Sequence, residues 1–295
     1  MMLSTVKSMR RNLLGWLLAL VLSVAPGVAQ AASVKVYAFH AGILKTQTQY
    51  LLKDTRVGTP MDIPIPFLVI QHGKEWVAFD TGCNAHAAKD PAGHWGETIA
   101  KAYIPVIKPE EEFREAIKLL GLAPRDFKAV VISHGHIDHA GAIDNFMGTG
   151  VPIYFQKAEM REVRKVVEAS TTGAAYCLGD FKHLKELNIW EIEGVFDVFG
   201  DQTVMAFPTP GHTHGHQSLY VKPSTGKAFI YCADALYTLE NMERFVPPGL
   251  AADIPGAMQN VHWFKLEQRR GVKIVPSHDP GYWAKRAWAP KELVP

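Results

Sequence analysis

The stretch 132-ISHGHIDHAGA-142 places three histidines and an aspartate within six residues. It follows 128-KAVVIS-133, an apolar run without alternation, which predicts a strand covered on both faces. Side chains two apart in an extended chain point the same way, so His134 and His136 can bind one ion. Asp138 and His139 can face a second. A solvated polar turn is the weaker alternative for a complete H-x-H-x-D-H, because its residue types are those that zinc and similar ions bind.

A site for two ions needs further ligands, and each remaining candidate ends a predicted strand. The segment 208-PTPGHTHGHQS-218 offers His212, His214 and His216. Asp234 ends 228-AFIYCAD-234, and His278 ends 273-KIVPSH-278. Taken singly, such residues lie at the surface or in a satisfied core as often as in a site. Several ligands at several strand ends predict one site at an edge of a sheet.

Hydrophobic patterning predicts strands that come in runs with helices between them, as in a layered α/β or α+β domain. A hairpin is expected across Gly73, and no linker divides the chain after residue 31. The predicted strands are 34–39, 66–73, 75–82, 128–133, 152–156, 203–209, 217–223, 227–234 and 273–279, and the predicted helices are 109–121, 158–168 and 258–270.

The first 31 residues have the three parts of a secretory signal peptide. A basic start precedes the apolar run 13-LLGWLLALVLSVA-25, and 29-AQA-31 permits cleavage after Ala31. A retained membrane anchor is the alternative, but the run is short for a span. We therefore expect an exported protein, periplasmic or secreted, with one domain over 32–295 and no stable membrane insertion of the mature chain.

Charge and cysteine content exclude some partners. The chain has 31 basic and 29 acidic residues, and removing the three basic residues of the leader leaves 28 against 29, a formal charge of −1. A near-neutral chain without a basic run gives no electrostatic reason to bind nucleic acid. Cys83, Cys177 and Cys232 are an odd number, so they cannot all pair within one chain, and buried thiols are the simpler expectation.

The ordered motifs resemble those of the metallo-β-lactamase superfamily, and within it those of the N-acyl homoserine lactonases. They are 80-DTG-82, 134-HGHIDHAG-141, 209-TPGHTHGHQS-218, 234-DALY-237 and 278-HD-279. The resemblance implies an α+β fold, an αβ/βα four-layer sandwich, in which two mixed β-sheets lie face to face with helices on the outer sides.

The resemblance also implies roles. His134, His136 and His212 would bind the first metal, and Asp138, His139 and His278 the second. Asp234 would bridge both. Asp80 would orient a ligand from behind, His216 would support rather than bind, and His214 ranks below His212 as a ligand. Tyr237 would hydrogen-bond the substrate, although a packing role is its alternative, and Asp138 could carry a proton.

The implied reaction is the opening of the lactone ring of N-acyl homoserine lactones, which is quorum quenching, by a hydroxide held between two divalent ions. Zinc is favoured, while iron, cobalt or manganese also suit such ligands. A secreted β-lactamase is the nearest rival, but those enzymes lack the bridging aspartate. Thiolester hydrolases of the glyoxalase II kind and phosphodiesterases keep it. A periplasmic metal-binding protein without turnover is the non-enzyme alternative.

The sequence does not determine which residues line the acyl groove. It also leaves the oligomeric state open, and a homodimer is one option. Candidate groove residues, which core packing explains equally well, are Ile104, Val106, Phe146, Met147 and Trp263.

Overall fold

Two apolar segments form the hairpin that starts the first sheet in the computed structural model. β2 (Pro60–His72) pairs antiparallel with β3 (Glu75–Phe79), and Gly73 turns between them with a positive φ of 60°. β3 then pairs parallel with β5 (Ala129–Val131), which is buried along its whole length as its unbroken apolar run predicts. The sheet has seven strands in the order β4 (Ile104–Val106), β1 (Val34–Gln47), β2, β3, β5, β6 (Pro152–Gln156) and β7 (Asn188–Ile192).

The second sheet is built from the second half of the chain. It has five strands in the order β12 (Lys273–Val275), β11 (Phe229–Tyr231), β10 (Gln217–Val221), β9 (Val204–Pro208) and β8 (Phe196–Asp197). β11 and β12 are parallel and the other pairs are antiparallel, so this sheet is mixed, as the first is.

Alternation along the strands divides the apolar side chains into separate cores. On β2, Leu68 and Ile70 face the second sheet, where they join a cluster with Leu219 and Phe229. Phe67 and Val69 point the other way and join a cluster with side chains of the first sheet's helices. A third cluster lies between the second sheet and α7 and α8. Three apolar interfaces separate four layers, which confirms the predicted sandwich of two facing sheets with helices outside.

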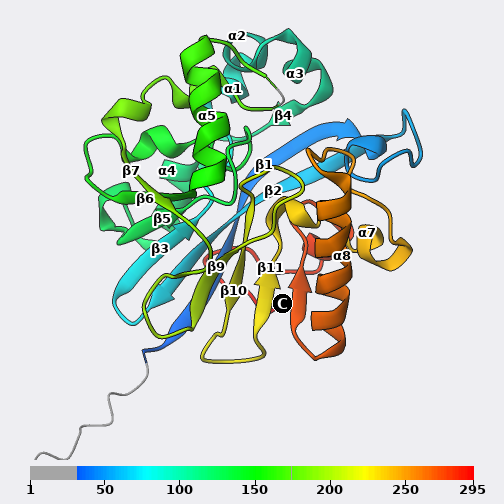
Figure 1. Cartoon of the computed structure of the whole chain (residues 1–295). Coiled ribbons are helices and arrows are strands. Elements are labelled where there is room, and N and C mark those ends of the chain that lie inside the picture. The colour runs from blue at the N-terminus through cyan, green and yellow to red at the C-terminus, as the bar shows by residue number, and fades with distance from the viewer. Residues whose placement is uncertain (1–31, 174) are drawn as a thin grey trace, which may run out of the picture. The chain divides into compact units, whose positions relative to one another are not determined.

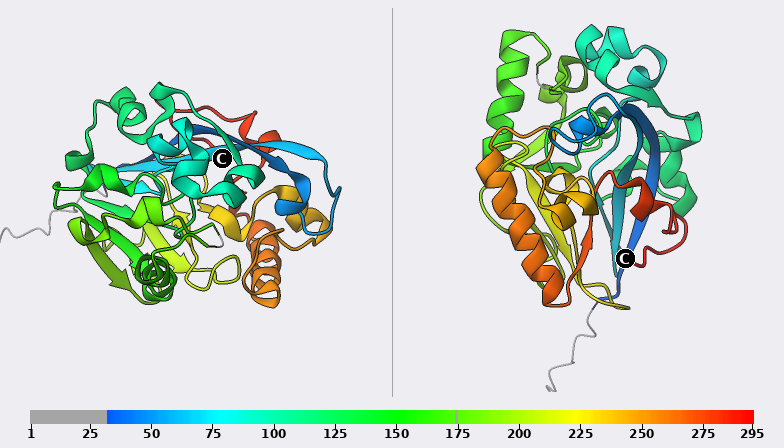
Figure 2. Two further views of the ribbon diagram at one scale, coloured as in Figure 1. Left: turned by 90° about the horizontal axis from the view of Figure 1, so that it is seen from above. Right: turned by 90° about the vertical axis from the view of Figure 1, so that its right-hand side faces the viewer.

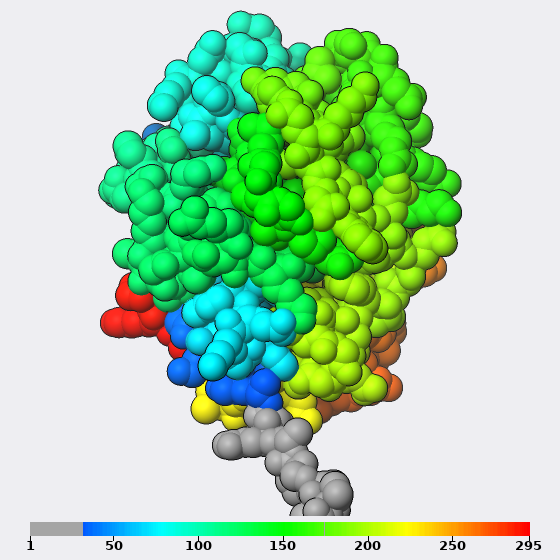
Figure 3. All heavy atoms as spheres, turned by 90° about the vertical axis from the view of Figure 1, so that its left-hand side faces the viewer, coloured from blue at the N-terminus to red at the C-terminus, as the bar shows by residue number. Residues whose placement is uncertain are grey.

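The helices lie on the outer sides of both sheets (Figure 1). In the right-hand view of Figure 2, α8 and the teal segments lie at opposite edges, with strands between them. Figure 3 shows an outer face formed largely by segments from the first two thirds of the chain. The helices are α1 (Ala85–Lys89), α2 (Pro91–Trp95), α3 (Glu97–Ala102), α4 (Phe113–Ala116), α5 (Lys157–Ala169), α6 (Leu178–Phe181), α7 (Leu239–Arg244), α8 (Ile254–Arg269) and α9 (Pro280–Trp283).

Three local predictions were incomplete. The helix expected over 109–121 is broken into short helical pieces, because Glu112 is extended and starts α4 anew. β1 runs to Gln47 rather than ending at Phe39, since a register shift between His40 and Ile43 lets pairing resume beyond Gly42. A side chain at Gly42 would lie 2.7 Å from the Ile107 side chain, and its φ is +90°, so glycine suits this bulge. The strands β4, β7 and β8 and the helices α1 to α3, α6, α7 and α9 were not predicted.

The structure describes residues 32–173 and 175–295. Ser33–Pro295 form one compact unit, whereas the predicted leader, 1–31, lies outside the described residues. In the described part, no helix has the length and apolar character needed to cross a membrane. The three cysteines are buried free thiols, as expected.

Candidate metal centre

Four chain segments from both sheets bring the predicted ligands together. The loop after β5 carries His134, His136, Asp138 and His139, and the loop between β9 and β10 carries His212. Asp234 lies in the short 3-10 helix Ala233–Ala235 after β11, and His278 follows β12. Loops at strand ends are free to carry polar groups because the strands behind them hold their position.

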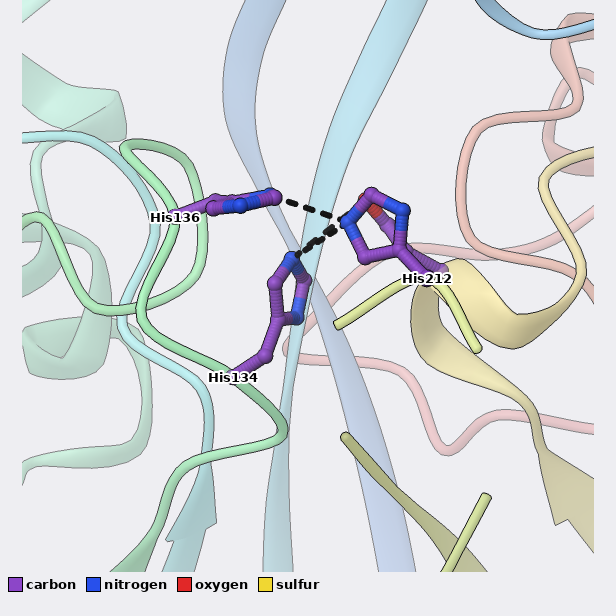
Figure 4. A group of neighbouring side chains, drawn as sticks. His134, His136 and His212 are labelled. Carbon is purple, nitrogen blue, oxygen red and sulfur yellow. Dashed lines mark hydrogen bonds and ion pairs between the residues drawn. The ribbon is translucent and has the colours of Figure 1, made fainter. Parts of the chain in front are cut away.

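The first set consists of three histidine rings that converge on one point (Figure 4). Nε2 of His212 lies 3.0 Å from Nε2 of His134 and 2.9 Å from Nδ1 of His136. Nδ1–H of His212 donates to the Leu250 carbonyl at 2.9 Å, which leaves the lone pair of Nε2 facing the other two rings. Lone pairs held this close repel one another unless a proton or a cation lies between them.

The second set combines one carboxylate with two imidazoles. Oδ2 of Asp138 lies 3.3 Å from Nε2 of His278, and Oδ1 lies 3.7 Å from Nε2 of His139. Nδ1–H of His278 donates to the carbonyl oxygen of Pro64 at 2.8 Å, so Nε2 points toward the other ligands. This set offers nitrogen and oxygen ligands from two loops.

Asp234 lies between the two sets and gives one oxygen to each. Its Oδ2 is 3.4 Å from Nε2 of His212 and 3.6 Å from Nε2 of His134. Its Oδ1 is 3.0 Å from Nε2 of His278 and 3.2 Å from Nε2 of His139. A carboxylate divided in this way is placed to bridge two cations, the role that the resemblance implies for it.

The donor set fits two divalent cations. Ligand atoms within each set lie within 4.8 Å of one another, and Nε2 of His139 and Oδ1 of Asp234 are buried without a hydrogen-bond partner. No lysine or arginine is buried among the described residues, so the buried acids of the centre have no such counterion. An uncompensated buried charge is costly, and cations of charge +2 would offset it.

The pKa values of the histidines differ between the sets. Burial, followed by neighbouring histidines, lowers the pKa of His134 and of His136, which keeps these imidazoles neutral and able to bind a metal. Burial also acts to lower the pKa of His139, but Asp234, Asp138 and Asp80 outweigh it and raise the value. Three acids therefore make the second set the more strongly negative of the two.

Asp80 lies behind the second set and contacts His139. Nδ1–H of His139 donates to its Oδ2 at 2.8 Å, and the backbone N–H of Ser133 donates to its Oδ1 at 2.7 Å. The Ser133 hydroxyl, which the sequence analysis did not single out, also donates to Oδ2 at 2.9 Å and lies 3.0 Å from Nδ1 of His134. Such partners fix the ring orientation of a metal-binding histidine.

His216 supports Asp234 from behind. Its Nε2 accepts the backbone N–H of Asp234 at 3.1 Å, while its Nδ1 lies 2.8 Å from the hydroxyl of Thr209. Nε2 of His216 therefore accepts a backbone hydrogen bond and does not take part in the ligand cluster. His214 is exposed, in agreement with its lower rank.

An apolar cavity of about 490 Å³ opens beside the first set. Tyr50, Ile99, Tyr103 and Leu250 contribute to its walls, together with His136 and His212. A smaller, adjoining pocket reaches Asp138, Asp234 and Tyr237. The groove residues that the sequence left open lie elsewhere: Phe146 belongs to the first core, and Ile104 and Val106 are half exposed on the edge strand β4.

Tyr237 lines the smaller pocket together with Asp138, Asp234 and His278. Its hydroxyl oxygen is 3.1 Å from Nδ1 of His212, whose hydrogen is already donated to the Leu250 carbonyl, so the phenol hydrogen is free to donate to another acceptor. Burial, with the nearby charge of Asp234, raises the pKa of Tyr237 and keeps the phenol protonated.

Several supporting residues were missed by sequence reasoning, namely Ser133, Glu159, Tyr176, Thr209 and the cavity tyrosines Tyr50 and Tyr103. Ser133 and Thr209 each lie within three residues of a predicted ligand, which is the signal that could have found them. The other residues lie far from any predicted ligand in the sequence, so no such signal marks them.

Comparison with known proteins agrees with this geometry. The model of the metallo-β-lactamase superfamily matches residues 63–278. The N-acyl homoserine lactonase AttM of Azorhizobium caulinodans is 31% identical over 263 residues, which cover 87% of this chain and 97% of that protein. AttM of Rhizobium radiobacter is 32% identical over 264 residues, covering 88% and 98%.

A solved N-acyl homoserine lactone hydrolase, with N-hexanoyl-L-homoserine at its catalytic metal centre, has the same fold. Its TM-score is 0.78 at 24% identity, with 88% of this chain and 99% of that chain covered. Fold and donor set together define a metal-dependent hydrolase with a two-cation centre. The chain belongs to the metallo-β-lactamase superfamily and, within it, to the family of the N-acyl homoserine lactonases.

Proposed function

We propose that this protein opens the lactone ring of N-acyl homoserine lactones. The observation that carries the proposal is that the Asp234 carboxylate and the Tyr237 phenol line one small pocket, which adjoins the apolar cavity. A polar centre suits the ring ester, and an adjoining apolar wall suits an acyl chain. The AttM relatives named above are N-acyl homoserine lactonases, which supports the same substrate class.

Two divalent cations, once bound, would acidify a water molecule and polarise the ester carbonyl. His134, His136 and His212 would hold one, Asp138, His139 and His278 the other, and Asp234 both. Zinc is our first choice because nitrogen and carboxylate ligands suit it.

The protein's own groups would orient the ester and move a proton. The Tyr237 hydroxyl can donate to the carbonyl oxygen as negative charge develops there. A water oxygen joins the carbonyl carbon, the ring C–O bond breaks, and the ring oxygen takes up a proton to give N-acyl homoserine. Asp138 lines the pocket beside His278 and can carry that proton.

A side-by-side assay tests the proposal. Purified protein with measured metal content would be given homoserine lactones of several acyl lengths, a simple γ-lactone, a chromogenic cephalosporin and a glutathione thiolester. We expect the acyl homoserine lactones to be hydrolysed with the highest kcat/KM. Preference for the cephalosporin would overturn the assignment, and bound metals without any turnover would favour a metal-binding protein.

We further propose that the protein is exported, with residues 1–31 removed as a signal peptide. The basic start, the apolar run and the small residues at 29–31 support this. Fractionation of cells expressing the full chain, with sequencing of the mature N-terminus, tests it. A cytoplasmic protein that keeps its first residues would contradict it.

A further inference from the structure

Glu159 is a buried acid that lies outside both ligand sets. It lies in the first turn of α5, directly after β6, and its side chain is fully buried. Four groups around it donate hydrogen bonds. Oε1 accepts the backbone N–H of Gly135 at 2.7 Å and the hydroxyl of Tyr176 at 2.7 Å. Oε2 accepts the hydroxyl of Thr213 at 2.6 Å and the backbone N–H of Gly215 at 3.2 Å.

These four donors belong to the surroundings of the three-histidine set. Gly135 lies between His134 and His136, and Thr213 follows His212 directly. The ring of Tyr176 packs edge-on against His136, with centroids 4.7 Å apart. One carboxylate thus connects the loop after β5 to the loop between β9 and β10, which together supply all three histidines.

Two glycines make this close approach feasible. A Cβ at Gly215 would lie 2.0 Å from the backbone nitrogen of Glu159, and one at Gly135 would lie 2.8 Å from the Tyr176 ring. Neither glycine has a positive φ, so the requirement is for space rather than for backbone conformation. The close approach of the Glu159 backbone therefore explains the glycine of H-G-H-Q, and the close approach of the Tyr176 ring explains that of H-G-H.

We propose that Glu159 is the positioning residue of the three-histidine set, as Asp80 is for the other. Asp80 holds His139 through its ring nitrogen, whereas Glu159 acts on the backbone and hydroxyl groups next to the histidines. With Asp138 and Asp234, they make four buried carboxyl groups around the centre.

The test is the retention of cobalt by Glu159→Gln. Glutamine has one acceptor oxygen, and its NH₂ group would face a backbone N–H and a hydroxyl, so the backbone N–H of Gly135 or of Gly215 loses its acceptor. We expect the affinity of the three-histidine set for Co²⁺ to fall about 10- to 100-fold, as for other partners of metal ligands. After equilibration with a chelator that leaves two ions on the wild type, the variant should retain fewer than two.

The matched control is Glu168→Gln, on the exposed side of the same helix. It should retain two ions and the visible Co²⁺ spectrum of the wild type, whereas the spectrum of Glu159→Gln should change. If Glu159→Gln keeps both ions with unchanged affinity and spectrum, the proposal is wrong.

Thr213→Val decides the question if Glu159→Gln does not fold. It removes one donor of the four, so circular dichroism should show a folded protein whose cobalt affinity falls by less. An affinity equal to that of the wild type would overturn the proposal. These measurements need no substrate, so they stand apart from the lactonase assignment, and a protein that opens no lactone could still show them.

Discussion

Two buried clusters of metal-ligating residue types lie in this domain, and they differ in what can occupy the space between their polar atoms. In the metal centre, Nε2 of His212 faces two other ring nitrogens at 2.9 and 3.0 Å. In the second cluster, Nε2 of His94 lies 2.6 Å from Oδ1 of Asp180, while the Cys177 thiol donates to the His94 carbonyl oxygen at 2.8 Å. An imidazole and a carboxylate share a proton, whereas facing ring nitrogens that both carry lone pairs repel one another until a proton or a cation lies between them.

The thiol of the second cluster points to the same conclusion. Burial raises the pKa of Cys177 to about 11, so the thiolate that a metal needs is scarce at neutral pH. Residue type and proximity are alike in the two clusters. The two clusters therefore differ in whether their polar atoms already have hydrogen-bond partners within the cluster. Where they do, the cluster is an ion pair; where they do not, it is a metal site.

Chelation gives the largest expected effect. Exhaustive removal of metal should abolish hydrolysis, because the pKa of uncoordinated water is far above neutrality. Readdition of Zn²⁺ or Co²⁺ should restore it. Elemental analysis of the active protein should find two ions per chain. A third ion that is lost when Cys177 is replaced would show that the second cluster is also a metal site.

Asp234→Asn should have the next largest effect. The amide keeps the shape of the side chain but loses the charge shared by both sets, so metal content and rate should fall together. We expect a loss in kcat/KM greater than the ~100-fold that follows removal of a supporting partner. Two bound ions with a normal rate would show that Asp234 is not a bridge.

Tyr237→Phe should separate chemistry from metal binding. The phenol contacts His212 on the side away from the facing nitrogens, so both ions should remain bound. Removing one donor to a developing oxyanion should lower kcat by about 100-fold. If every lactone tried is hydrolysed at the normal rate, the proposed role of Tyr237 is wrong.

Asp180→Asn should affect stability and leave metal content at two. Burial raises the pKa of Asp180 from 3.8 to about 6, even though His94 opposes the rise. The folded state therefore holds this proton more tightly than the unfolded state, and stability is lost as pH rises from about 4 to 6. The full difference is on the order of 3 kcal/mol.

Urea unfolding in the presence of a chelator measures this effect without any contribution from metal loss. Relative to the wild type, Asp180→Asn should gain stability between pH 4.5 and 7, whereas Glu168→Gln should change little. Parallel pH profiles for the wild type and Asp180→Asn would contradict the raised pKa of Asp180.

The sequence predicted the centre better than the walls of its cavity. Ligands at strand ends are recognisable because an apolar run precedes each one, and a sheet brings such ends together, so His134, Asp234 and His278 could be placed in advance. Tyr103 could not, because it follows three short helices whose Ala, Gly and His content has no helical period. Glu159 begins an ordinary amphipathic helix, and only the fold reveals its buried side chain.

The sharing of Asp234 has a consequence for how the centre fills. An ion that enters either set restrains the rotamer of this carboxylate, and the same restraint aims its other oxygen at the vacant set. The two binding events are therefore thermodynamically linked, and a titration of metal-free protein should not follow two independent isotherms. Molecules with one bound ion would then be a minor species. The protein would change from metal-free to holding two ions over a narrow range of free metal concentration.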